Sequence, residues 1–115
     1  MQRDREFLLD ILEAARLARS YLAGISKAQF LGDVQRQDAV IRRLEIVGEA
    51  ARRISPETRA VLPGLPWKPM IGMRNVMIHE YDDVDLETVW NTAENDIPRI
   101  IETIEPLLQD SSNAS

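Results

Sequence analysis

The spacing of apolar residues constrains the fold of this chain more than any other feature of its sequence. Between residues 86 and 108, apolar side chains recur at steps of three and four, which places them on one face of an α-helix. No segment keeps the two-residue alternation of a β-strand over a useful length. The sequence therefore predicts an all-α protein. The apolar face of this last segment consists of Leu86, Val89, Trp90, Ala93, Ile97, Ile100, Ile101, Ile104, Leu107 and Leu108.

Residues that favour helix ends divide the chain into four main helices and a few short ones. We expect the main helices at residues 5–22, from 33 or 38 to 54, 66–81 and 85–108. Ser26 and Ser55 should cap short helices, and Pro98 should kink the last main helix because proline cannot donate a backbone hydrogen bond. This pattern favours an antiparallel bundle of four main helices plus short helices. We expect one helical domain at residues 1–109, followed by a mobile C-terminal tail at residues 110–115.

The composition restricts the protein class further. The 115 residues contain no cysteine, which excludes disulfides, thiolate metal sites and cysteine nucleophiles. The N-terminal residues lack the apolar stretch of a secretory signal, and no segment is apolar and long enough to span a membrane. We therefore expect a cytoplasmic protein without a membrane partner. The net charge of −5 argues against non-specific coating of nucleic acid but allows a local basic site.

Several other residue types in the chain suggest structural roles. The pairs Arg42-Arg43 and Arg52-Arg53 are typical of a solvated helix face. Gly48 lies inside a predicted helix and is small enough to let another helix approach closely. Met70, Met73 and Met77 are expected to fill the core.

No cofactor or metal site is expected from the sequence. No glycine-rich loop follows a strand, and no histidine or cysteine cluster has the spacing of metal ligands. Glu45 and Glu49 lie four residues apart on one helical face and could form a carboxylate pair. A metal role for this pair is disfavoured because histidine and aspartate partners are missing nearby in the sequence.

The most informative stretch is RNVMIHEY at residues 74–81, which contains the only histidine of the chain. At about 100° per residue, Asn75 and His79 share a helical face, and Arg74 and Tyr81 lie on an adjacent stripe. These four residues could be an ordinary helix end, where histidine stabilises the helix dipole. They could also form a phosphodiester site, because histidine transfers protons near neutral pH and arginine offers a fixed, charged fork to phosphate oxygens.

The flanking sequences carry a resemblance to a known family. The segments QDAVIRRLEIVGEAARRIS, PWKPMIGMRNVMIHEY and DVDLETVW resemble segments of the HepT-like toxins, in the same order along the chain. The octet itself matches the R-x4-H-x-Y signature of these toxins, which belong to the HEPN superfamily. The resemblance extends from about Glu6 to Leu108.

This resemblance implies a fold, an activity and a set of partners. The HepT-like toxins are homodimeric all-α bundles that cleave RNA without a metal. By resemblance, Arg74 and His79 are the catalytic pair, Asn75 is the supporting polar residue, and two protomers bring their motifs together in a composite site. Tyr81 corresponds to the tyrosine that a cognate minimal nucleotidyltransferase antitoxin modifies with AMP to silence the toxin.

Two other functions are compatible with the sequence. The chain could be a non-catalytic HEPN-type module whose polar patch binds a nucleotide or a protein. It could also be an inert helical oligomerisation domain. The complete set of Arg74, Asn75, His79 and Tyr81 favours a ribonuclease toxin, whereas the acidic net charge favours the alternatives.

Overall fold

The computed structural model describes the backbone of residues 2–79 and 85–113, and the side chains of residues 3–74 and 85–109. All secondary structure within these ranges is helical, which confirms the predicted all-α class. In chain order the helices are α1 (Gln2–Leu22), α2 (Lys27–Leu31), α3 (Val34–Arg53), α4 (Pro56–Val61), α5 (Trp67–His79), α6 (Leu86–Asn91), the π-helix η1 (Thr92–Asp96) and α7 (Ile97–Asn113).

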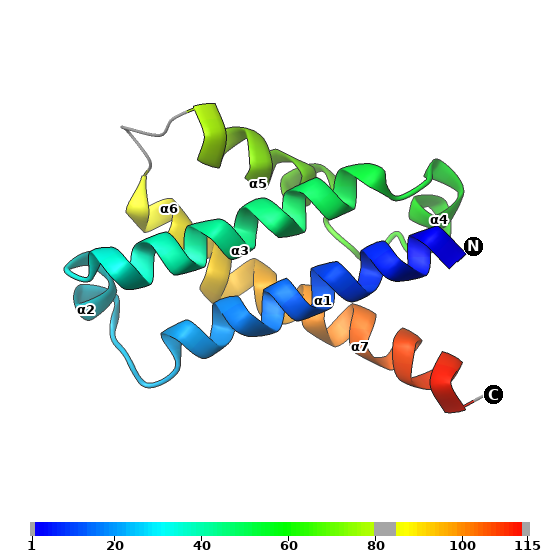
Figure 1. Ribbon diagram of the computed structural model, residues 1–115, viewed down its shortest axis with the longest axis horizontal. Helices are drawn as coiled ribbons and strands as arrows, with labels where there is room; N and C mark the ends of the chain where they lie inside the picture. The colour runs from blue at the N-terminus through cyan, green and yellow to red at the C-terminus, as the bar shows by residue number, and fades with distance from the viewer. Residues whose placement is uncertain (1, 80–84, 114–115) are drawn as a thin grey trace.

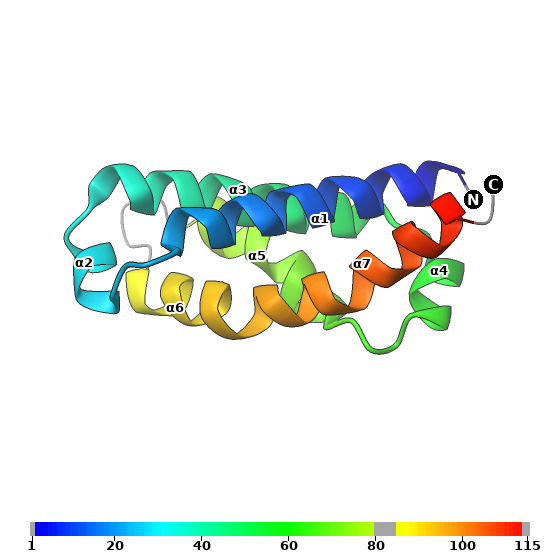
Figure 2. The ribbon, with the colours of Figure 1, turned by 90° about the horizontal axis from the view of Figure 1, so that it is seen from below.

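The long helices lie side by side along the length of the molecule. Helices α1 and α3 run in opposite directions and pack against each other (Figure 1). Helix α5 packs on α3 and runs back along it, while α7 packs on α1 from below (Figures 1 and 2). Helix α3 is therefore the central element, with α1 on one flank and α5 on the other.

Short polar side chains cap the starts of α2, α3, α4 and α6. Asp33 caps α3, and its Oδ1 accepts a hydrogen bond from the backbone N–H of Arg36 at 3.1 Å, so α3 begins at the earlier of the two predicted positions. Ser26 and Gln29 form a complete capping box at the start of α2. Ser55 caps α4, and Asp85 caps α6, as expected from short polar side chains at these positions.

The last predicted helix differs from a regular α-helix near Pro98. The turn Thr92–Asp96 is a π-helix, in which Ile97 N–H donates to the carbonyl of Thr92, five residues earlier. Pro98 lacks the N–H that a regular α-helix needs at this point, and a wider turn before it accommodates that loss. Figure 1 shows the chain changing direction between α6 and α7, so the predicted kink occurs as a π-helical turn.

The C-terminal part of the chain is more helical than predicted. Helix α7 continues to Asn113, beyond residue 109, where we placed the end of the helical domain. Pro106 lies inside α7 without ending it. The backbone of residues 110–113 is therefore helical, because neither glycine nor proline follows Leu108 to stop the helix.

The core lies between α1, α3, α5 and α7. Its largest fully buried side chains include Ile11, Leu44, Met70 and Ile100, one from each of these helices. Met73 is also buried, so two of the three predicted core methionines are confirmed, and the side chain of Met77 lies outside the described residues. In the part of the chain that the structure describes, no helix is long and apolar enough to cross a membrane.

Candidate active site around Arg74

The backbone of Arg74 is held where α5 crosses α3 at Gly48. A Cβ atom built on Gly48 would lie 2.6 Å from the backbone nitrogen of Arg74 and 3.0 Å from the carbonyl oxygen of Met70. Only a residue without a side chain permits this approach. The prediction that Gly48 allows close contact with another helix is therefore confirmed, and the helix that it admits is the one that carries Arg74.

The first turn of α5 is anchored to the preceding segment. The indole Nε1 of Trp67 donates a hydrogen bond to the carbonyl of Leu62 at 2.9 Å, and the guanidinium of Arg59 lies 5.9 Å from the centre of the Trp67 ring. Met70 N–H donates to the carbonyl of Pro66 at 2.9 Å, which closes the first helical turn. These contacts fix the start of α5, and Gly48 fixes its middle.

The side chain of Arg74 is paired with Glu49, the residue that follows Gly48. Arg74 Nε lies 2.5 Å from Glu49 Oε2. Glu49 Oε1 lies 3.1 Å from an Arg53 terminal nitrogen and 3.7 Å from an Arg52 terminal nitrogen. One carboxylate thus contacts three guanidinium groups. The side chains of Arg74 and Glu49 are about one third exposed, at 33% and 34%, so solvent and ligands can reach the pair.

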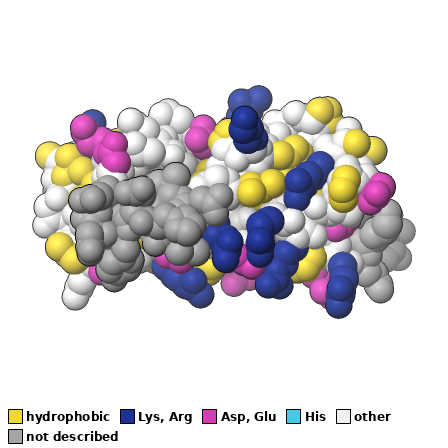
Figure 3. Space-filling view, turned by 90° about the horizontal axis from the view of Figure 1, so that it is seen from above, with side chains coloured by type: hydrophobic (Ala, Val, Ile, Leu, Met, Phe, Trp, Pro, Cys, Tyr) yellow, Lys and Arg dark blue, Asp and Glu magenta, His cyan; other side chains and the backbone are white. Residues whose placement is uncertain are grey.

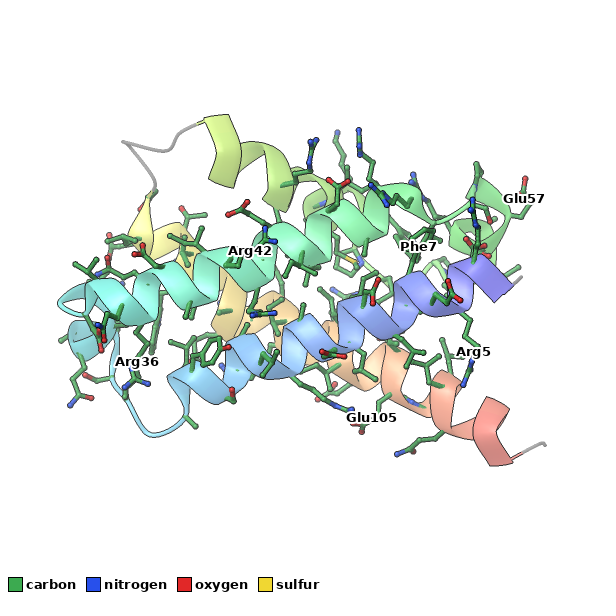
Figure 4. All side chains as sticks on the ribbon, viewed as in Figure 1. Arg5, Phe7, Arg36, Arg42, Glu57 and Glu105 are labelled. Atoms are coloured by element: carbon green, nitrogen blue, oxygen red, sulfur yellow. The ribbon has the colours of Figure 1, made fainter. Side chains whose placement is uncertain are left out.

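A groove of about 430 Å³ opens beside this pair. Figure 4 labels two of its lining residues, Phe7 on α1 and Arg42 on α3, so the groove is bordered by both helices. Seen from the α5 side of the molecule, Lys and Arg side chains gather over α3 and α5 with acidic side chains among them (Figure 3). The groove is lined by Phe7, Asp10, Arg42, Glu45, Ile46, Glu49, Ala50, Arg53 and Arg74.

Of the four predicted site residues, the structure places the side chain of Arg74 alone. Asn75 and His79 lie on helix α5, which is continuous to His79, but their side chains lie outside the described residues. Tyr81 lies outside the described residues altogether. Five residues of regular helix separate the Arg74 and His79 backbones by about 7.5 Å along the axis. The roles of Asn75, His79 and Tyr81 therefore remain predictions.

The interaction between Glu49 and Arg74 was not predicted from the sequence. From the sequence, Glu45 and Glu49 could form a carboxylate pair, for which a metal role was disfavoured. In the structure Glu45 lies 3.9 Å from Arg42, and Glu49 contacts three arginines. The spacing of Glu49 with Arg52 and Arg53, three and four residues later, is a recognisable ion-pair signal. Nothing local indicates Arg74, which is 25 residues away in the sequence.

Comparison with known proteins gives the family. The family model described as "Ribonuclease HepT-like" matches residues 11–107, a span that includes Gly48, Glu49 and the whole Arg74–His79 segment. The chain belongs to the HepT-like ribonuclease family. No solved structure matches it.

Two relatives whose names describe ribonucleases are similar to this chain over most of its length. "Probable ribonuclease HepT" of Thermococcus cleftensis is 40% identical over 96 residues, which cover 84% of this chain and 87% of the relative. "Putative RNase MJ1380" of Methanocaldococcus jannaschii is 39% identical over 101 residues, covering 88% of this chain and 93% of the relative. The similarity therefore extends over most of the helical fold.

Proposed function

We propose that this protein is an endoribonuclease that cleaves RNA without a metal, and that it is the toxin of a toxin–antitoxin pair. The observation that carries the proposal is the family match across residues 11–107, together with relatives whose names describe ribonucleases. The position of Arg74 supports it, since this guanidinium borders an open groove that a phosphate group can enter.

The proposed reaction needs three functions at one phosphodiester. A base takes the proton of the ribose 2′-hydroxyl, whose oxygen then attacks phosphorus. An acid gives a proton to the 5′-oxygen as the P–O bond to it breaks, which leaves a 2′,3′-cyclic phosphate and a 5′-hydroxyl. Cations stabilise the additional negative charge on the phosphorane. His79 has the proton-transfer chemistry for the first two functions, Arg74 serves the third, and Asn75 supports them by hydrogen bonding.

A single chain supplies one imidazole for two proton transfers. Two copies of the chain, arranged with their α5 helices close together, would supply one His79 as base and the other as acid, together with two copies of Arg74. We therefore propose a homodimer with a composite site. This arrangement explains how an acidic chain with one histidine performs the reaction.

The test is cleavage of a fluorescent RNA by the purified protein in the presence of EDTA. We expect the chelator to leave the rate unchanged, and His79→Ala to lower it about 10²–10⁴-fold because a general acid and base are lost. The thermal transition of the variant should stay close to that of the wild type. A folded wild-type protein that binds RNA without cutting it would support the non-catalytic module instead.

We further propose that Tyr81 is the regulatory residue of this site. A cognate nucleotidyltransferase antitoxin would transfer AMP from ATP to the Tyr81 hydroxyl, releasing pyrophosphate. The added phosphate and nucleotide would place negative charge near Arg74 and oppose RNA binding. Incubation with the partner enzyme and ATP should add AMP units to the wild type, as measured by intact mass. Tyr81→Phe should stay unlabelled and ribonucleolytic, and equal labelling of the two proteins would contradict this assignment.

A further inference from the structure

We propose that Glu49 is the positioning residue for Arg74. This inference rests on the proposed function of Arg74 at the phosphodiester, and it gives a role to a residue outside the R-x4-H-x-Y motif. Glu49 does not touch the substrate in this role. It acts through the guanidinium that does.

The contact geometry assigns this role. Glu49 Oε2 engages Arg74 through Nε, at 2.5 Å. An arginine held at Nε retains two terminal nitrogens, and these form the edge of the guanidinium that grips phosphate oxygens in pairs. The contact therefore orients the arginine and leaves its phosphate-binding edge available. A partner bound across the terminal nitrogens would instead have competed with the phosphate.

Glu49 is itself held from its other oxygen. Glu49 Oε1 contacts Arg53 at 3.1 Å and Arg52 at 3.7 Å, and both arginines are on the same helix as Glu49. Arginine and glutamate side chains have many rotamers, and fixing them during the reaction would cost conformational entropy. Because these ion pairs already hold Glu49 and Arg74 in the absence of substrate, the two side chains lose less conformational entropy when RNA binds.

Two consecutive residues of α3 thus set the position of Arg74. The Arg74 backbone nitrogen lies 2.6 Å from the position that a Cβ atom on Gly48 would take, so only glycine allows this contact. Glu49 then orients the Arg74 side chain. Gly48 and Glu49 on α3 together form the binding surface that holds Arg74 of α5, and we call these two residues the seat for Arg74. An arginine on a lone exposed helix would lack both constraints.

This role can be tested with a variant that removes the charge of Glu49, because the loss of negative charge should favour RNA binding while the loss of orientation should slow the reaction. Glu49→Gln keeps the size of the side chain but removes a negative charge near Arg52, Arg53 and Arg74, which should hold or improve RNA binding. The loss of orientation should lower the catalytic step. We therefore expect kcat to fall about 10-fold to 100-fold while KM stays unchanged or decreases.

A matched control is available on another part of the molecule. Glu94 has a side-chain exposure of 34%, equal to that of Glu49, and pairs with Arg19 at 3.2 Å. Glu94→Gln should keep the wild-type kcat. On an Arg74→Ala background, Glu49→Gln should cause no further loss, because the residue through which it acts is gone. A general loss of stability would instead lower activity on both backgrounds.

The second measurement is the NMR signal of the Arg74 Nε–H group, assigned by its disappearance in Arg74→Ala. We expect slow exchange with solvent in the wild type and Glu94→Gln, and fast exchange in Glu49→Gln. Wild-type kcat in Glu49→Gln, or an unchanged Nε–H signal, would overturn the inference. A wild type that does not cleave RNA would contradict the proposed function, and the NMR signal would still decide whether Glu49 positions Arg74.

Discussion

At the scale of single residues, the fold depends on a buried carboxylate near the N-terminus. Asp4 is only 7% exposed and joins α1 to the start of α4. Its Oδ2 accepts hydrogen bonds from the hydroxyls of Ser55 at 2.6 Å and Thr58 at 2.5 Å, and its Oδ1 accepts one from Ser55 N–H at 3.1 Å. These donors favour the ionised form, so the hydrogen bonds from the Ser55 and Thr58 side chains lower the pKa of Asp4 below its ordinary 3.8.

We expect this contact to make stability depend on pH in a defined window. Because the folded-state pKa of Asp4 is lowered, its contribution is complete above the ordinary pKa of 3.8 and is lost as the pH falls through the lower folded value. Asp4→Asn should therefore cost about 1–2 kcal/mol at pH 7, since a charged acceptor is lost. Urea unfolding at pH 7 and at pH 3 measures this difference, which should shrink at the lower pH.

Asp10→Asn is the control for this prediction, since Asp10 is an exposed aspartate on the same helix. The control should unfold like the wild type at both pH values. A cost for Asp4→Asn that is equal at pH 7 and pH 3 would show that shape, and not charge, makes Asp4 important.

Single residues also show where sequence-based prediction succeeds and fails. The polar residues of the RNVMIHEY stretch were identified from the sequence because they follow one another on one predicted helix. The contacts of Asp4 with Ser55 and of Glu49 with Arg74 were not, because these partners lie 51 and 25 residues apart in the sequence and are brought near by tertiary packing. Local patterns contain little information about such contacts, even when both partners are ordinary charged residues.

At the scale of helices, the sequence predicts ends better than irregularities. Short polar caps form hydrogen bonds within three residues. The helix starts at Asp33, Ser55 and Asp85 can therefore be recognised from the neighbouring sequence alone. The π-helical turn before Pro98 is different, because proline predicts a kink but does not say whether the kink forms as a break in the α-helix or as a wider π-helical turn. The packing of the whole segment decides between them.

The contact between α3 and α5 at Gly48 leads to a prediction at this scale. In Gly48→Ala the new Cβ would meet the Arg74 backbone nitrogen at 2.6 Å and the Met70 carbonyl at 3.0 Å, and backbone atoms cannot rotate away. Helix α5 must move, so we expect a loss of about 1–3 kcal/mol in unfolding free energy. Ribonuclease activity should fall as well, since Arg74 moves with the helix. Thermal and urea unfolding with the RNA cleavage assay measure the two effects.

Gly72→Ala provides the matched control on α5. Nothing lies within 4 Å of a Cβ built at Gly72, and alanine favours a helix over glycine by about 0.5–1 kcal/mol. This variant should be as stable as the wild type or more so. A Gly48→Ala protein with the stability of Gly72→Ala would mean that α5 can shift at no cost, and the seat for Arg74 would be looser than proposed.

At the scale of the whole molecule, charge and apolar surface bear on the proposed dimer. Large exposed apolar patches often mark surfaces that bind another protein chain. Among the described residues, the large exposed apolar side chains lie on five different helices, at Leu9, Leu31, Val34, Val61 and Leu107. The dimer proposal therefore rests on the chemistry of the site, which needs two imidazoles, and not on one apolar face.

A composite site predicts that an inactive subunit lowers the RNA cleavage rate of the wild-type subunit with which it forms a dimer. At micromolar concentration, sedimentation equilibrium should give twice the 13.1 kDa mass of one chain. When a fixed amount of wild type exchanges subunits with an excess of His79→Ala, most wild-type chains enter mixed dimers that lack one of the two imidazoles. We expect the RNA cleavage rate to fall as the excess rises, whereas an excess of bovine serum albumin should leave it unchanged. A rate that stays constant with His79→Ala while the subunits demonstrably exchange would place the complete site within one chain.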